Sequence, residues 1–340
     1  MFDFSSLVNL PLIWGLLIAT AILFYVLMDG FGLGIGILLP FAPSNKCRDH
    51  MINSIAPFWD GNETWLVLGG AGLFAAFPLA YSILMPAFYI PIIIMLLGLI
   101  MRGISFEFYF KAEGKSRLLW SCAFHYGSLG AAFCQGMILG AFIRGVKVNG
   151  RNFSGGQFDW ASAFSMMTGI AIVFGYALLG STWLIMKTED ITQKWARKVA
   201  SYTLSFVGIF MALVSIVTPF LNEGIKNFWF SVPNFYYLSF VPLLTSLLFF
   251  ILWFDLQDTK REYRLFFLSI AIFFMGYLGL GISIYPWIIP FHYTILDAAA
   301  SGSSLSLMLV VTVPLLPLIL TYTGYSYYVF RGKSSNERTY

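Results

Sequence analysis

Five ionisable side chains lie inside stretches of sequence that are otherwise strongly apolar. They are Asp29, Asp60, Glu63, Arg102 and Glu107. A charged side chain at the centre of a membrane helix costs roughly 2.5 to 3.5 kcal/mol on insertion scales, so the few that occur are the first candidates for function.

The spacing of Asp60 and Glu63 favours proton chemistry. Residues three apart share one face of a helix, so two carboxylates can approach one cation, one arginine or one shared proton. One arginine, Arg102, faces three acids, and this excess of carboxylate favours a proton or cation role. The alternative is a buried ion pair that only fixes helix packing. Glu107 lies nearer a helix end, where a simple snorkelling role is the plainer interpretation.

Histidine and cysteine patterns do not indicate a cofactor site. His125 alone falls inside an apolar stretch, where it could ligate a haem or serve as an ordinary core histidine. The three histidines are expected at different levels, so no two can pair as axial haem ligands: His50, His125 and His292. The cysteines do not form a disulfide framework. We therefore expect no catalytic residue and no metal site in this chain, and the sequence assigns no cofactor to it.

The elements that must position these residues are membrane helices. The chain is 59% hydrophobic and only 11% charged, and a membrane-spanning helix needs roughly 20 apolar residues. The sequence therefore predicts an all-α, polytopic membrane protein with about nine helices, arranged as two bundles plus a peripheral helix. The predicted spans are 10 to 39, 51 to 77, 79 to 108, 118 to 143, 160 to 186, 198 to 221, 235 to 255, 264 to 287 and 302 to 330.

Loop charges predict the orientation. Fifteen of the 20 Lys and Arg residues fall in loops on one side, including the C-terminal Arg338, and four fall on the other. Because positively charged loops stay in the cytoplasm, the N-terminus is expected outside and the C-terminus inside. The first span is too long for an ordinary cleaved signal peptide. We read no nucleic-acid partner into the net charge of +4.

The depth of the polar residues follows from this topology. At about 1.5 Å of rise per residue, Asp29, Asp60, Glu63 and Arg102 fall roughly 10 to 18 Å from the cytoplasmic edge, so that they could meet. We expect a single membrane domain, 1–340, with possible halves at 1–145 and 159–340 around a glycine-rich outer loop.

Several motifs resemble one known family. Asn53–Leu66 resembles the signature of cytochrome bd oxidase subunit II. Its residues are similar to those of the branch called cyanide-insensitive oxidases. Matching motifs continue in order along nearly the whole chain: Met28–Gly34, Arg102–Phe108, Gly175–Gly180 with Trp183 and Lys187–Glu189, Leu296–Ala300 and Tyr325–Lys333.

The resemblance implies a function and a partner. It implies the second subunit of a quinol oxidase in the bacterial inner membrane, with b-type and d-type haems carried by subunit I. That enzyme oxidises quinol, reduces dioxygen to water and takes protons from the cytoplasm. Asp60, with the segment from Trp59 to Glu63, would then border the proton path. Asp29 would support it, and Arg102 with Glu107 would form a supporting ion pair.

Some questions stay open at this point. Family members often have a second acid after Asp29-Gly30-Phe31, where this chain has Gly32, so a role needing two acids there is in doubt. A proton- or cation-coupled secondary transporter is the rival class, and a structural scaffold is a third. A small accessory subunit, membrane lipid and quinone are further candidate partners.

Overall fold

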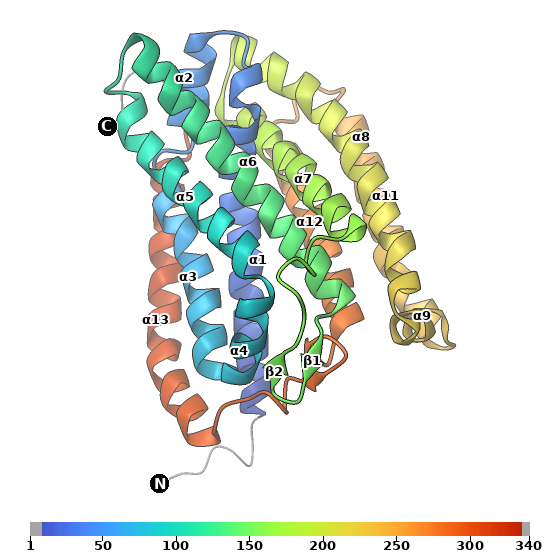
Figure 1. The fold of residues 1–340 in the computed structure, drawn as a ribbon. Coiled ribbons are helices and arrows are strands. Elements are labelled where there is room, and N and C mark those ends of the chain that lie inside the picture. Colours follow the sequence, from blue (N-terminus) through green and yellow to red (C-terminus); the bar gives the residue numbers. More distant parts are fainter. Residues whose placement is uncertain (1–8, 335–340) are drawn as a thin grey trace.

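The computed structural model describes residues 9–334, and these are almost entirely helical (Figure 1). Within this part of the chain, eight segments are long and apolar enough to cross a membrane. The shortest has 21 residues, which at about 1.5 Å per residue covers the roughly 30 Å hydrocarbon core. The predicted all-α membrane architecture is thus confirmed. The helices that form these segments are α1 (Leu10–Leu38), α5 (Tyr89–Tyr109), α6 (Gly114–Arg144), α7 (Ala163–Lys187), α8 (Asp190–Leu221), α10 with α11 (Asn234–Leu238 and Phe240–Asp255), α12 (Tyr263–Ile284) and α13 (Gly302–Val329).

The second predicted span, 51 to 77, is not one continuous helix. A 3₁₀ turn, η2 (Leu39–Phe41), leads into α2 (Asn45–Asn53), and residues 54–58 then form turns before α3 (Trp59–Ala76) begins. Pro57 disfavours a helix through this segment because it lacks an N–H donor and restricts the preceding residue. α3 then leads through the short α4 (Pro78–Ala87) into α5.

Close helix crossings place α1 at the centre of the bundle, packed against α3, α6 and α7. A Cβ atom on Gly34 of α1 would lie 1.8 Å from the carbonyl oxygen of Tyr176 on α7. A Cβ atom on Gly98 of α5 would lie 2.6 Å from the carbonyl oxygen of Gly127 on α6. These glycines let the helix backbones approach, which is how small residues serve membrane helix packing.

Two parts of the molecule are only loosely covered by the rest of the chain. Figure 1 shows α8 and α11 leaning away from the bundle toward α9 (Glu223–Phe230). On the opposite side, α13 has one buried residue, Leu305. The apolar side chains of α13 therefore face lipid or another protein.

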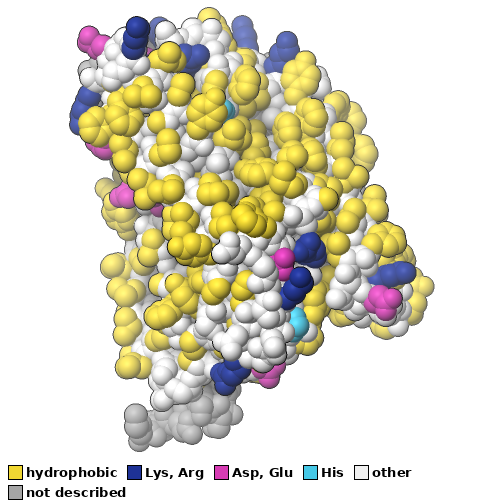
Figure 2. All heavy atoms as spheres, viewed as in Figure 1, with side chains coloured by type: hydrophobic (Ala, Val, Ile, Leu, Met, Phe, Trp, Pro, Cys, Tyr) yellow, Lys and Arg dark blue, Asp and Glu magenta, His cyan; other side chains and the backbone are white. Residues whose placement is uncertain are grey.

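The two ends of the bundle differ in structure and charge. Two small antiparallel hairpins lie at one end, β1 (Val148–Asn149) with β2 (Asn152–Phe153), and β3 (Trp287–Ile289) with β4 (Tyr293–Thr294). At the other end lie α2 and the start of α6, and Figure 2 shows several Lys and Arg side chains gathered there. Arg338, which the sequence places at this end, lies outside the described residues.

Candidate functional site

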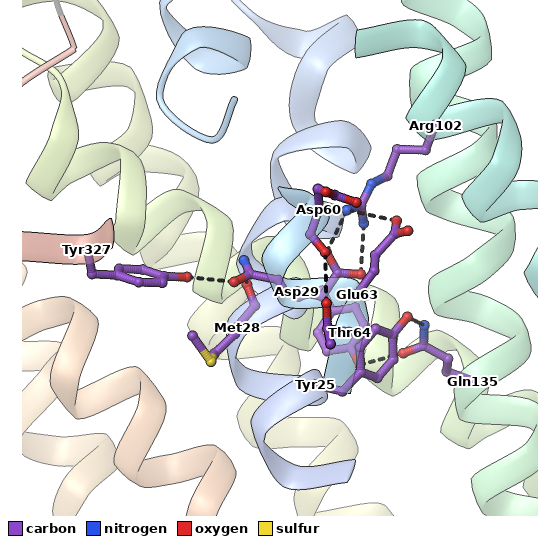
Figure 3. A network of polar contacts seen from close by, with 11 residues as sticks. Tyr25, Met28, Asp29, Asp60, Glu63, Thr64, Arg102, Gln135 and Tyr327 are labelled. Carbon is purple, nitrogen blue, oxygen red and sulfur yellow. Dashed lines mark hydrogen bonds and ion pairs between the residues drawn. The ribbon is translucent and has the colours of Figure 1, made fainter. Parts of the chain in front are cut away.

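A buried ion pair between Asp29 of α1 and Arg102 of α5 lies at the centre of the site (Figure 3). The guanidinium binds the carboxylate with both Nη atoms, at 2.9 Å and 2.6 Å. Arg102 is 0% exposed and Asp29 is 1% exposed. Two parallel charge-assisted hydrogen bonds of this kind fix the geometry of both side chains.

Glu63 of α3 adds a second carboxylate to the same arginine. Its Oε1 lies 3.3 Å from Nη2 of Arg102, and its side chain is 27% exposed. The cluster thus contains two acids and one base, and the two acids differ in how far their side chains are exposed at the surface of this chain. The structure brings together three of the residues that the sequence placed at similar depth.

The break before α3 determines where Asp60 lies. The N-cap residue Phe58 makes no side-chain hydrogen bond, and Asp60 lies in the first turn of the helix. A carboxylate in this position is stabilised by the positive end of the helix dipole. Asp60 is exposed, and it forms no ion pair with the described residues. Asp60 thus lies beside the Asp29–Arg102 pair (Figure 3) but forms no ion pair with Arg102.

Trp59 and Glu107 occupy the edge of the site. The ring of Trp59 stacks on Phe106 of α5, with the ring centres 5.0 Å apart. Glu107 lies on the exposed side of α5 and pairs with Lys111 at 3.7 Å rather than with Arg102. The structure therefore places Arg102 and Glu107 in different ion pairs.

A chain of uncharged polar groups extends from the cluster into the core. Tyr176 of α7 donates a hydrogen bond to Oε1 of Gln135 at 2.6 Å, and Nε2 of Gln135 donates to the hydroxyl of Tyr25 at 2.8 Å. Tyr25 lies one helical turn before Asp29 on α1. Charged residues in apolar spans do not reveal this hydrogen-bonded series in the sequence, because all three side chains are neutral at pH 7.

A second uncharged contact joins three helices beside Glu63. Asn62 of α3 is 2% exposed. Its Nδ2 donates to the carbonyl oxygen of Met28 on α1 at 2.7 Å, and its Oδ1 accepts from the hydroxyl of Tyr327 on α13 at 3.0 Å. The only sequence signal was that both residues lie within family motifs, and these motifs are far apart along the chain.

The histidines lie apart from the cluster. Nδ1 of His125 lies 3.1 Å from the carbonyl oxygen of Gly36, so this ring is engaged at the contact between α6 and α1. Among residues 9–334, no group of three or more His, Cys, Asp or Glu side chains could hold a metal ion. The cysteines of this part of the chain are free thiols.

A polar contact closes the basic end of the bundle. Lys333, beyond α13, pairs with Glu262 at the start of α12 and donates to the carbonyl oxygen of Thr188 at 3.1 Å. Partial burial raises the pKa of Glu262, but hydrogen bonds from Lys333 and Gln193 outweigh this effect and hold its pKa below the usual range.

The fold and the site together define a polytopic helical membrane protein with a buried Asp–Arg–Glu cluster inside its bundle. Comparison with known proteins places it more narrowly. The family model for cytochrome bd terminal oxidase subunit II matches residues 10–330. The chain therefore belongs to the cytochrome bd terminal oxidase subunit II family, and it is a subunit of a terminal oxidase.

The chain aligns with individual relatives over nearly the full length of both proteins. The chain is 27% identical to cytochrome bd-I ubiquinol oxidase subunit 2 of Escherichia coli (strain K12), over 96% of each chain. It is 26% identical to cytochrome bd ubiquinol oxidase subunit 2 of Bacillus subtilis (strain 168), over 96% of this chain and 97% of that one. The fold matches a chain of the bd oxidase from Geobacillus thermodenitrificans with a TM-score of 0.73 and 17% identity, covering 95% of this chain and 99% of that one.

Proposed function

We propose that this chain is a haem-free subunit II that contributes to proton uptake from the cytoplasm, while subunit I oxidises quinol and reduces dioxygen to water. The observation that carries the proposal is the gradation in burial of three acids. Asp60 is exposed, Glu63 is partly buried beside Arg102, and Asp29 is fully buried on the same arginine.

The geometry suggests different roles for these acids. A carboxylate that carries protons must be able to change its protonation state without losing all of its partners. Asp29 is held by two hydrogen bonds from Arg102, which favours a fixed counter-charge. Asp60 and Glu63 are less constrained, so we assign proton transfer to these two and a supporting electrostatic role to the buried pair. Trp59 covers one side of this segment through its stack on Phe106.

The family implies haems in the complex, and we assign the b-type and d-type haems to subunit I. His125 is the one histidine within a predicted span, and no second histidine of the described residues lies at its level to complete an axial pair, while its Nδ1 contacts the Gly36 carbonyl oxygen. When bound in the partner, these haems supply electron transfer and oxygen reduction. The residues of this chain supply protons and a docking surface.

The partner is expected to cover the outward face of α3 beside α13. Val67 and Phe74 of α3 are 69% and 60% exposed, and Leu318 of α13 is 67% exposed. Lipid tolerates those apolar side chains, but the exposed carboxylate of Asp60 on the same helix is costly there. A polar or hydrated surface of subunit I against Asp60 removes this cost and connects the acids to the site of oxygen reduction.

We further propose the orientation that the loop charges predict, with the N-terminus outside and the C-terminus in the cytoplasm of a bacterial inner membrane. The end carrying α2 and Lys333 is then cytoplasmic, and the two small hairpins are outside. Quinone, lipid and a small accessory subunit remain candidate neighbours of the assembled complex.

The experiment replaces the two acids assigned to proton transfer, Asp60 and Glu63, by neutral side chains in the purified complex. Asp60→Asn and Glu63→Gln should lower quinol-dependent oxygen consumption per haem by about tenfold or more, because a proton-transfer group is lost while the fold is retained. Glu223→Gln is the matched control, since this exposed carboxylate lies on the distant α9.

Haem content from reduced-minus-oxidised spectra separates the outcomes. Wild-type turnover in the haem-replete Asp60→Asn and Glu63→Gln variants would remove both acids from the path. Loss of haem in these variants would instead assign them a structural role.

A further inference from the structure

The first turn of α3 carries the proposed proton-transfer acids, yet it lacks a side-chain cap of its own. Its position depends on contacts with other helices. We propose that Tyr327 of α13 is a positioning residue, whose hydroxyl acts through Asn62 to hold the first turn of α3 so that Glu63 faces Arg102. This inference rests on the proposed proton role of Glu63 and deepens it.

The hydrogen bonds of Asn62 fix the direction of its amide. Nδ2 donates to the Met28 carbonyl oxygen at 2.7 Å, so Oδ1 must point the other way, toward Tyr327 at 3.0 Å. Met28 directly precedes Asp29, and Asn62 directly precedes Glu63. The buried amide of Asn62 therefore links the backbone beside Asp29 to the helix turn that carries Glu63.

Stacking places the Tyr327 hydroxyl in register with Asn62. The Tyr327 ring stacks on Phe58, the N-cap residue of α3, with ring centres 4.4 Å apart and an interplanar angle of 22°. Phe58 also meets Trp183 of α7 edge-on, and the indole Nε1 of Trp183 donates to the Ser54 carbonyl oxygen at 3.3 Å. The interrupted segment before α3 is thus held from α7 and from α13.

The residues after α13 keep Tyr327 in place. Lys187, at the end of α7, is 5% exposed and donates to the carbonyl oxygens of Phe330 and Gly332. The backbone N–H of Ser334 donates to the Lys187 carbonyl oxygen at 2.7 Å. Two motifs singled out in the sequence, Lys187–Glu189 and Tyr325–Lys333, therefore meet at one contact. Because most of α13 is exposed, this contact and the Asn62 bond carry much of its attachment at this end.

The test compares Tyr327→Phe with Tyr328→Phe in the intact complex. Tyr327→Phe removes one hydroxyl and keeps the stack on Phe58. Tyr328 is the matched control, because it is 63% exposed and its hydroxyl makes no hydrogen bond with the described residues. We expect Tyr327→Phe to retain haem, to turn over about fivefold more slowly per haem, and to have a displaced pH profile of turnover. A fivefold change corresponds to about 1 kcal/mol, the typical contribution of one hydrogen bond.

A second variant tests whether Tyr327 acts through Asn62. In an Asn62→Leu background, Tyr327→Phe should cause no further loss of turnover, because the shared bond is already absent. Full additivity of the two losses would overturn the inference, as would loss of haem from Tyr327→Phe with an unchanged pH profile. Wild-type behaviour of Tyr327→Phe beside a slowed Asp60→Asn would refute the positioning role and leave the proton proposal intact.

Discussion

Replacing Asp29 by asparagine should strongly destabilise the complex, because it leaves a buried guanidinium without its main counter-charge. Arg102 is 0% exposed and donates two hydrogen bonds to the Asp29 carboxylate. Breaking a buried ion pair from one side costs roughly 3 to 5 kcal/mol. Glu63 remains 3.3 Å from the same guanidinium and can compensate in part. We therefore expect about 3 kcal/mol, the lower end of that range.

The assay is a double-mutant cycle on the purified oxidase, with Asp29→Asn, Arg102→Met and the double variant. Thermal inactivation and haem retention report the stability of each form. Removing both charges of a buried pair is often close to neutral, since no charge is then left without a partner. The double variant should consequently be more stable than either single variant, with a coupling energy of about 2 kcal/mol or more.

Additive losses in the cycle would refute this reasoning, since they would show that the two side chains do not interact in the membrane. Wild-type stability of Asp29→Asn alone would also refute it, because it would mean that water reaches the arginine. The same cycle with Glu63→Gln in place of Asp29→Asn should give a smaller coupling energy, because the Glu63 side chain is 27% exposed.

Two further outcomes follow from the packing and from the basic end of the bundle. Gly34→Ala should prevent assembly of a haem-replete complex, as judged by the yield of haem on purification. Its Cβ atom would lie 1.8 Å from the Tyr176 carbonyl oxygen, whereas Gly281→Ala meets nothing within 4 Å and should behave as wild type. Glu262→Gln should lower thermal stability at neutral pH by about 0.5 to 1 kcal/mol, since the pair with Lys333 is partly exposed. The folded pKa of Glu262 is lowered, so the stabilisation is present above its unfolded pKa of about 4.3 and is lost as pH falls through the folded value. Thermal midpoints measured across the acidic range should therefore converge for the wild type and the variant, and a constant difference would contradict the assignment.

Much of the site was predictable because a charge in an apolar span is a strong signal. The cost of burying Asp29, Glu63 and Arg102 singles them out in the sequence, and helical rise places them at similar depth. The family assignment then decides between an oxidase subunit and the transporter that the residues alone left open. The proposed halves of the chain and the roles of the individual acids stay predictions.

The remainder depended on features that hydropathy does not record. A window average over residues 51 to 77 conceals the turns at 54–58, so Asp60 was expected deep within a helix and instead lies in the first turn of α3. Lys187 was counted as a loop cation, but the segment after α13 covers it to 5% exposure. Asn62 and Tyr327 carry no charge and are separated by most of the chain. Their contact becomes visible only once α13 is packed against α3.

The interrupted helix gives these observations a common physical basis. A continuous helix would place Asp60 in mid-span, where its charge lacks backbone donors and is costly in lipid. Starting α3 at this depth provides free N–H groups and the positive end of a helix dipole near Asp60. Glu63 lies about one turn further along, roughly 5 Å of rise, and already reaches the buried arginine. A single helical turn thus leads from an exposed acid to the interior. A helix start without a cap must be held by its neighbours, and here Asn62 and Tyr327 provide that hold.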